Sequence, residues 1–174
     1  MLSLPNLRSF NIKARELEGD DRHLDMFLQK HPNLVEIDLS CRPNDNYEHL
    51  DGVDSVNFTL PLLEVLSGHP SFVQHVLLGS TDPLNNVACI KGIDLCKMPD
   101  EALRKIDENK IRMLSVDQVG ALENLYRFRA LQWLRVRGDE VIYDADVKFY
   151  RVLSAVSILR TIGVITCQLI TPLG

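Results

Sequence analysis

Residues 129–140 read RALQWLRVRGDE, and two kinds of side chain alternate within this stretch. Its aliphatic residues follow the spacing aliphatic-x-x-aliphatic-x-aliphatic and are Leu131, Leu134 and Val136. The alternate positions carry the only tryptophan of the chain and two arginines, which are Trp133, Arg135 and Arg137. Successive side chains of a β-strand point to opposite faces of the sheet. The stretch therefore predicts a strand with one buried face and one exposed face.

The same spacing recurs along the whole chain. The segments that share it are 7–12, 34–39, 73–78, 90–95, 111–116, 131–136 and, more loosely, 159–164. Their first residues lie 17 to 39 residues apart, and most of the intervals suit one strand plus one helix. Self-similarity at such a period is typical of repeat architectures. We therefore predict a strand in each of these segments.

Helical spacing of apolar residues lies between most of the predicted strands. The first helix is predicted over 24–28, after two aspartates that favour a helix N-terminus, and His-Pro at 31–32 ends it. A second helix is predicted over 62–66, with Gly68 as its C-terminal stop. Three further helices are centred on 103–106, 122–126 and 149–153. Five helices thus alternate with seven strands.

Polar residues inside the predicted strands decide between two architectures. A doubly wound sheet buries both faces of its strands, which then read as continuous apolar runs, whereas a solenoid carries helices on one face only. Here alternate strand positions are polar, as at Asn11, Asp38, Asp94, Ser115 and Arg135. We therefore expect an α/β solenoid of about six to seven irregular repeats, with a curved parallel sheet and helices on its convex side.

Composition narrows the class of protein. The chain has 174 residues, of which 45% are hydrophobic and 25% charged, and this favours a single globular domain over 1–174. A net charge of −5 argues against a nucleic-acid binder, because phosphate neutralisation needs clustered Lys and Arg. The N-terminus lacks a secretory signal, and the most apolar window, 158–173, is interrupted by Arg160 and Gln168. We expect no membrane segment and a cytoplasmic or nuclear location.

Residues with catalytic or metal-binding chemistry form no recognisable motif. Four scattered cysteines predict free thiols, and nothing in the sequence brings Cys41 together with His31 and His49 as nucleophile and base. His23 stands among three aspartates, at 20, 21 and 25, which suit helix capping better than cation binding. No glycine-rich phosphate loop occurs. We expect no cofactor and no metal.

The segment 42–58, RPNDNYEHLDGVDSVNF, lengthens one interval between strands and is acidic. It lacks the spacing of alternate oxygen ligands with a central glycine that a calcium loop requires. We expect an exposed loop insertion with an accessory contact to a partner.

Several segments resemble leucine-rich repeat units, namely LPNLRSFNI, HPNLVEIDLS, IRMLSVDQVGAL and LQWLRVRG. The irregular lengths and the phrases FLQKHPNLVEIDLS and LPLLEVLSGHP are similar to the repeat regions of fungal F-box proteins. The resemblance implies protein recognition on the concave sheet, often for delivery to a ubiquitin ligase. The Asn or Cys that such units carry at their ninth position is replaced by Arg15, Arg42, Met98, Val119 and Asp139. No F-box module is expected before the first strand, so ligase-adaptor function has no direct support.

The exposed face of the predicted strands supplies a candidate partner-binding site. Its residues are Asp94, Met113, Ser115, Asp117, Trp133, Arg135 and Arg137. Trp and Arg are enriched among residues that carry binding energy, because they combine large contact area with directed donors. The alternative is a solvated ladder in which the two arginines pair with the two aspartates.

The leading expectation for function is a non-catalytic scaffold that binds a protein partner on the concave sheet. A small α/β enzyme of hydrolase-like type, with unrecognised catalytic groups, is the alternative. A remnant of a larger gene, or a fragment of a longer array, is a third interpretation. The apolar first and last strand signals also predict self-association through the ends of the array.

Overall fold

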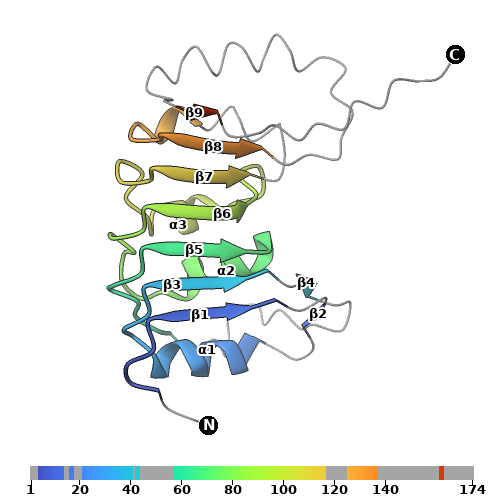
Figure 1. Ribbon diagram of the computed structural model, residues 1–174, viewed down its shortest axis with the longest axis vertical. Helices are drawn as coiled ribbons and strands as arrows, with labels where there is room; N and C mark the ends of the chain where they lie inside the picture. The colour runs from blue at the N-terminus through green and yellow to red at the C-terminus, as the bar shows by residue number, and fades with distance from the viewer. Residues whose placement is uncertain are drawn as a thin grey trace, which may run out of the picture.

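The computed structural model describes residues 4–13, 16–17, 21–40, 42–43, 57–116, 125–136 and 161–162. Its main feature is an open, seven-stranded sheet in which every neighbouring pair of strands is parallel (Figure 1). The strands follow one another in chain order and are β1 (Ser9–Ile12), β3 (Glu36–Leu39), β5 (Val65–Gly68), β6 (Cys89–Ile93), β7 (Met113–Val116), β8 (Trp133–Val136) and β9 (Thr161–Ile162). The predicted α/β class with a parallel sheet is confirmed.

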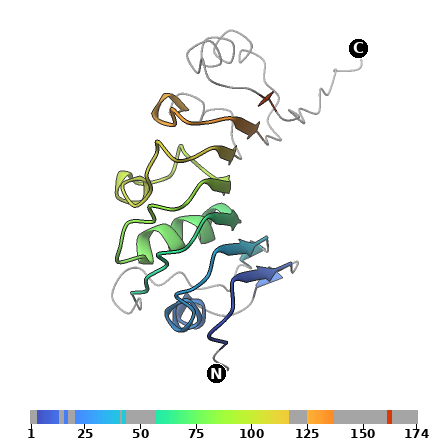
Figure 2. The ribbon, with the colours of Figure 1, turned by 60° about the vertical axis from the view of Figure 1, so that its left-hand side comes forward.

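The helices lie along one side of this sheet (Figure 2). They are α1 (Asp21–Lys30), α2 (Pro70–Gly79) and α3 (Asp100–Leu103), followed by a 3-10 turn at 125–127. A second, two-stranded parallel sheet pairs β2 (Glu16–Leu17) with β4 (Arg42–Pro43). No helix within the described residues is long and apolar enough to cross a bilayer.

The core lies between the sheet and the helices. One row of strand residues in register across the sheet is almost fully buried and comprises Ile37, Leu66, Ile90, Leu114 and Leu134. Apolar residues of α2 pack into the same cluster, including Phe72 and Val76. The expectation that Ile37, Leu114 and Leu134 belong to the core is confirmed.

A short turn with one recurring hydrogen bond precedes most strands. The amide of Leu7 donates to the carbonyl of Leu4 at 2.9 Å, and the amide of Leu63 donates to Leu60 at 3.2 Å. The same amide-to-carbonyl bond precedes β3, β6 and β8, where the donor and acceptor residues are Leu34 and His31, Val87 and Leu84, and Leu131 and Phe128. The turns before β3, β5, β6 and β8 each bury an apolar side chain, whereas Leu7 in the turn before β1 is partly buried. Each turn leads the chain back to the edge of the sheet.

Side chains join consecutive turns across this edge. The amide group of Asn33 donates to the carbonyl of Pro5 at 3.2 Å, and that of Asn86 donates to Pro61 at 2.7 Å. The ammonium of Lys110 reaches the carbonyl of Asn85 at 2.9 Å. These bonds supply donors to turn carbonyls that lie outside the strands, and they hold neighbouring strands in register.

The order of strand and helix between 59 and 79 is the reverse of the sequence-based prediction. The segment 62–66, predicted as a helix, contains the start of β5, and 73–78, predicted as a strand, lies within α2. Leu62 is 38% exposed, although a helix over 62–66 would bury it, whereas Leu60, Leu63 and Leu66 are buried at a spacing of three. The segment therefore follows the same order of turn and strand as the segments before β1 and β3.

Pro70 explains the error in α2. Proline is favoured in the first turn of a helix, where its missing amide is not needed, and here it begins α2 rather than ending a preceding helix. The buried residues Phe72, Val73, Val76 and Leu77 form a helical face. Leu78, which a strand reading would bury, is 37% exposed.

Gly92 interrupts the register of β6. Its φ of 82° lies in the left-handed region, and the pairing with β7 shifts between Lys91 and Ile93, so that Ile93 lies opposite Val116. A Cβ at Gly92 would lie 1.8 Å from the carbonyl oxygen of Gly68 on β5. Only glycine fits this position, for both conformational and steric reasons.

The remaining predicted elements have mixed outcomes. The predicted helix at 103–106 is replaced by the shorter α3, and only the 125–127 turn of the predicted 122–126 helix falls within the described residues. The predicted helix at 149–153 lies outside them. Most of the acidic insertion at 42–58 also lies outside, but both of its ends are ordered elements, since Arg42–Pro43 forms β4 and Phe58 is buried.

Candidate functional site on the open face of the sheet

The face of the sheet opposite the helices, here called the open face, carries two rows of side chains in register. The first row comprises Ser9, Glu36, Val65, Cys89, Met113 and Trp133. The second row comprises Asn11, Asp38, Ser67, Lys91, Ser115 and Arg135. The two rows lie two residues apart along each strand, which is about 6.6 Å.

The rows confirm the predicted face for β1, β3, β7 and β8 and correct it in the middle of the sheet. The sequence-based register placed 75, 77, 92 and 94 on this face. The first two lie in α2, and β6 pairs with β7 three residues earlier than predicted, so that Val65, Ser67, Cys89 and Lys91 occupy these places. Lys91 is therefore a candidate site residue that sequence reasoning missed.

Three of the predicted partner-binding residues lie together on the open face. Met113 is opposite Trp133 on the neighbouring strand, and Arg135 is two residues further along β8. Met113 is 37% exposed, while Trp133 and Arg135 are half-buried. Asp117 and Arg137 lie outside the described residues. Val65 and Cys89 extend the apolar part of the first row toward β5.

Asp94 does not lie on the candidate surface as predicted. It is 7% exposed, and its Oδ1 accepts the backbone amides of Cys96 at 3.1 Å and Lys97 at 3.3 Å. Its Oδ2 lies 3.7 Å from the ammonium of Lys97. Lys91, three residues earlier, occupies the row that contains Arg135, and Asp94 instead caps the turn after β6. Among the described contacts, Asp94 pairs with Lys97 and not with Arg135, the partner that the alternative of a cross-strand ladder required.

Polar groups on β1 and β3 bond to one another across the strands. The hydroxyl of Ser9 donates to Glu36 Oε2 at 3.2 Å, and the side-chain amide of Asn11 donates to Asp38 Oδ2 at 3.4 Å. Ser40 also donates to Asp38. The two carboxylates on this part of the open face therefore accept hydrogen bonds from neighbouring side chains.

The second row differs on β6, β7 and β8. Ser115 was predicted to be exposed, but it is 2% exposed, and its hydroxyl lacks a hydrogen-bond partner among the described residues. Lys91 and Arg135 flank it on the two neighbouring strands. Neither cation makes an ion pair within the part of the chain that the structure describes. Two cations and an unsatisfied hydroxyl therefore lie side by side.

Cys89 lies next to Lys91 on β6 and carries a free, buried thiol. Burial is the main cause of a raised pKa at Cys89. The charge of Lys91 lowers this pKa by a smaller amount, and the charge of Glu36 raises it. The thiol is therefore protonated at neutral pH and is a poor nucleophile. Cys96 is exposed, and Cys41 and Cys167 lie outside the described residues.

The candidate cation set around His23 is not assembled. His23 is exposed, whereas Asp25 is 1% exposed and its Oδ1 lies 2.6 Å from Nε2 of His75 on α2. Asp20 lies outside the described residues. Among the residues that the structure describes, no group of three or more His, Cys, Asp and Glu could hold a metal ion. Asp25 instead joins α1 to α2.

The histidines offer two contacts of catalytic type, but on different residues. Nε2 of His75 bonds to Asp25, while Nδ1 of His69 lies 2.7 Å from the hydroxyl of Ser71. An acid–base relay requires one histidine that bonds to both the nucleophile and the orienting carboxylate. The described contacts do not combine in this way.

His31, one of the two histidines considered with Cys41, makes structural contacts through both ring nitrogens. Its Nδ1 lies 2.7 Å from the carbonyl of Phe27, and its Nε2 accepts the amide of Leu4 at 3.1 Å. These contacts assign a neutral ring with the proton on Nδ1, because a carbonyl accepts and an amide donates. The ring is 2% exposed and ties the end of α1 to the turn before β1.

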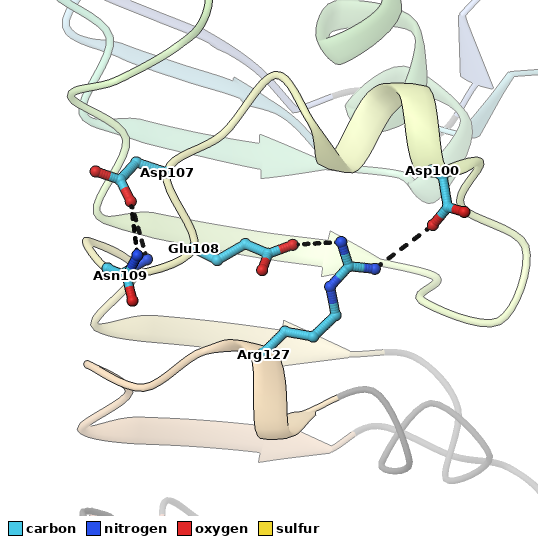
Figure 3. Close-up of polar contacts among 5 residues, drawn as sticks. All are labelled: Asp100, Asp107, Glu108, Asn109 and Arg127. Carbon is cyan, nitrogen blue, oxygen red and sulfur yellow. Dashed lines mark hydrogen bonds and ion pairs between the residues drawn. The ribbon is translucent and has the colours of Figure 1, made fainter.

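Sequence reasoning also missed an ion-pair network away from the open face. The guanidinium of Arg127 forms two ion pairs, in which Nη2 lies 2.6 Å from Oε1 of Glu108 and Nη1 lies 3.5 Å from Oδ1 of Asp100 (Figure 3). The hydrogen bond that Arg127 donates to Glu108 raises the pKa of Arg127. Asp107, in the same turn as Glu108, accepts two hydrogen bonds from Asn109. Arg127 therefore joins the 3-10 turn before β8 to the two preceding segments of the chain.

Comparison of the chain with protein-family models, with curated proteins and with solved structures finds no significant match.

Proposed function

We propose that this protein is a non-catalytic scaffold of leucine-rich repeat type, which binds another protein on the open face of its sheet. Strands in chain order, helices along one side and the recurring turn before each strand support the solenoid part of this proposal. Natural solenoids bind partners on such extended sheets.

The single observation that carries the proposal is the group formed by Met113, Trp133 and Arg135. These side chains lie on adjacent strands, and each keeps part of its surface accessible. Aromatic, Met and Arg side chains are enriched where protein interfaces gain most of their binding energy. The resemblance to the repeat regions of F-box proteins favours a substrate of a ubiquitin ligase as the partner.

The test compares partner capture by three forms of the chain. Wild type, Trp133→Ala/Arg135→Ala and the control Ser9→Ala/Asn11→Ala are immobilised, and proteins bound from a cell extract are quantified by mass spectrometry. The control changes the same face at the other end of the sheet. We expect one or more proteins to be lost with the first variant and retained with the control.

The ligase setting is tested separately. The abundance of each captured protein is measured in cells that contain or lack this chain, with and without proteasome inhibition. Proteasome-dependent accumulation in cells without the chain would support substrate delivery. Equal capture by all three forms would contradict binding through Met113, Trp133 and Arg135.

A further inference from the structure

The unsatisfied hydroxyl of Ser115 marks one position on the open face. A serine hydroxyl removed from water normally finds a donor or acceptor, because its desolvation is otherwise uncompensated. Ser115 is 2% exposed, and its Oγ has no such partner. The hydroxyl lies in the second row, directly between Lys91 on β6 and Arg135 on β8.

The missing chemical group at this position is an acceptor. Lys and Arg offer only donors, and a serine hydroxyl can donate as well. Adjacent strands are about 4.8 Å apart, so the two cationic side chains start roughly 10 Å apart and are long enough to converge above Ser115. An anionic group between them would accept hydrogen bonds from all three side chains.

Ser67 provides an internal comparison. It also lies in the second row and is 8% exposed, but its neighbours are Asp38 and Lys91, which carry opposite charges. The charged positions in this part of the row thus run negative, positive, positive, with a serine between each pair. Only the position of Ser115 combines two flanking cations with an unpartnered hydroxyl.

The first row indicates which anion fits. Met113 and Trp133 lie beside Ser115 and Arg135, two residues back along their strands. A ligand at this position therefore meets an anion-binding group and an apolar surface about 6.6 Å apart. An acidic and an apolar side chain of one protein segment match both, whereas inorganic phosphate matches only the first. Glu36 and Asp38 on the same face disfavour a polyanion such as a nucleic acid.

We infer that the site at Lys91, Ser115 and Arg135 binds the carboxylate of an acidic side chain of the partner, with an apolar side chain of the same segment on Met113 and Trp133. This inference rests on the proposed protein-binding function and specifies its partner as an acidic, apolar segment. Because the hydroxyl of Ser115 is covered, the side chains around it separate when the carboxylate enters.

The test uses blocked synthetic peptides in which leucine alternates with glutamate, glutamine or lysine. Binding to the full chain is followed by NMR titration at low ionic strength. We expect the glutamate peptide to shift the resonances of β6, β7 and β8, and the glutamine peptide to bind roughly tenfold more weakly, the loss typical of a charge-assisted hydrogen bond. Added salt should weaken only the glutamate peptide.

Matched variants locate the binding site. Lys91→Gln and Arg135→Gln should each weaken the glutamate peptide roughly tenfold, and Ser115→Ala roughly three- to tenfold. Ser67→Ala, the same change in the same row but on β5, should leave the affinity unchanged. The dispersion of the amide resonances verifies that each variant is folded.

Equal affinities for the glutamate and glutamine peptides would overturn the inference, as would equal effects of Ser115→Ala and Ser67→Ala. A stronger response to inorganic phosphate than to the glutamate peptide would overturn the assignment to a protein side chain. If captured proteins depend on Trp133 while the Lys91 and Ser115 variants retain them, the inference fails and the proposed function stands.

Discussion

The two halves of the open face use polar residues in different ways. On β1 and β3, Ser9 bonds to Glu36 and Asn11 bonds to Asp38, so each carboxylate has a partner on the neighbouring strand. On β6 to β8 the second row brings two cations to either side of a hydroxyl without a partner. Gly92 and its bulge lie on β6, the strand where the second half begins.

This difference separates polar side chains that stabilise the sheet from polar side chains that are available to bind a ligand. Cross-strand hydrogen bonds between side chains stabilise a sheet and leave few groups for a partner. Like charges beside an unsatisfied donor are unfavourable in the unbound protein and become favourable when an anion arrives. Exposure alone would favour β1 and β3 as the binding site, since Asn11 and Glu36 are more exposed than Ser115.

The largest expected effect comes from removing the boundary between the halves. Gly92→Ala places a Cβ 1.8 Å from the carbonyl oxygen of Gly68 and forces alanine into a left-handed conformation. We expect a loss of more than about 4 kcal/mol in the free energy of unfolding, or no folded protein. Urea denaturation measures this, with Lys91→Ala as the neighbouring control. If Gly92→Ala unfolded at the same urea midpoint as wild type, the bulge would not be required for stability.

The second prediction tests the two faces of β8. Leu134 is 1% exposed in the core, whereas Arg135 is half-buried on the open face. Leu134→Ala should lower the free energy of unfolding by about 2–5 kcal/mol, and Arg135→Ala by less than about 1 kcal/mol. Equal losses in urea melts would invalidate the assignment of faces on this strand.

A smaller effect is expected at Ser115. Because its buried hydroxyl has no partner, Ser115→Ala removes an unfavourable group and should raise the free energy of unfolding by up to about 1 kcal/mol. Thermal and urea unfolding measure the change, with Ser67→Ala as the matched variant. Destabilisation by Ser115→Ala would indicate that the hydroxyl has a stabilising contact, and the two halves would then resemble each other.

The smallest effect is the coupling between side chains within each half. A double-mutant cycle with alanine at Asn11 and Asp38 should give a favourable coupling of about 0.2–0.5 kcal/mol, because the two side chains are hydrogen-bonded. The corresponding cycle for Lys91 and Arg135 should give a coupling of opposite sign and below about 0.5 kcal/mol, since like charges repel. Coupling energies of the same sign in both cycles would show that the polar side chains of the two halves do not differ in this respect.

The strand period of two and the buried apolar spacing made most of the sheet predictable. They correctly assigned β1, β3, β7 and β8 and the two faces of each. The error at α2 arose because Val73, Val76 and Leu78 satisfy the strand spacing by chance, while the burial of Phe72 and Leu77 comes from tertiary packing. A proline in second position in LPNL, HPNL and LPLL marks the turn before β1, β3 and β5, and this signal would have located β5.

The candidate site was only partly predictable. Met113, Trp133 and Arg135 follow from the alternation within their strands. Lys91 does not, because Ile90 rather than Ile93 pairs with Leu114, and the bulge at Gly92 brings Ile93 opposite Val116 where a regular strand would place Gly92. The bulge depends on the close approach of Gly92 to the backbone of β5, a contact between distant segments. For the same reason Asp94 was assigned to the face when it caps a turn. The burial of Ser115 likewise depends on its neighbours in space.

The order of the strands also bears on how the chain folds. Each pair of neighbouring strands in the main sheet joins segments that lie 20 to 29 residues apart. The entropic cost of closing a loop changes slowly with its length, so every pairing in the ladder faces a similar barrier. Folding can then start at whichever pair forms first and spread to both sides by adding one strand at a time. A slow step at Gly92, which lies against the carbonyl of Gly68 on β5, would divide this growth into two stages.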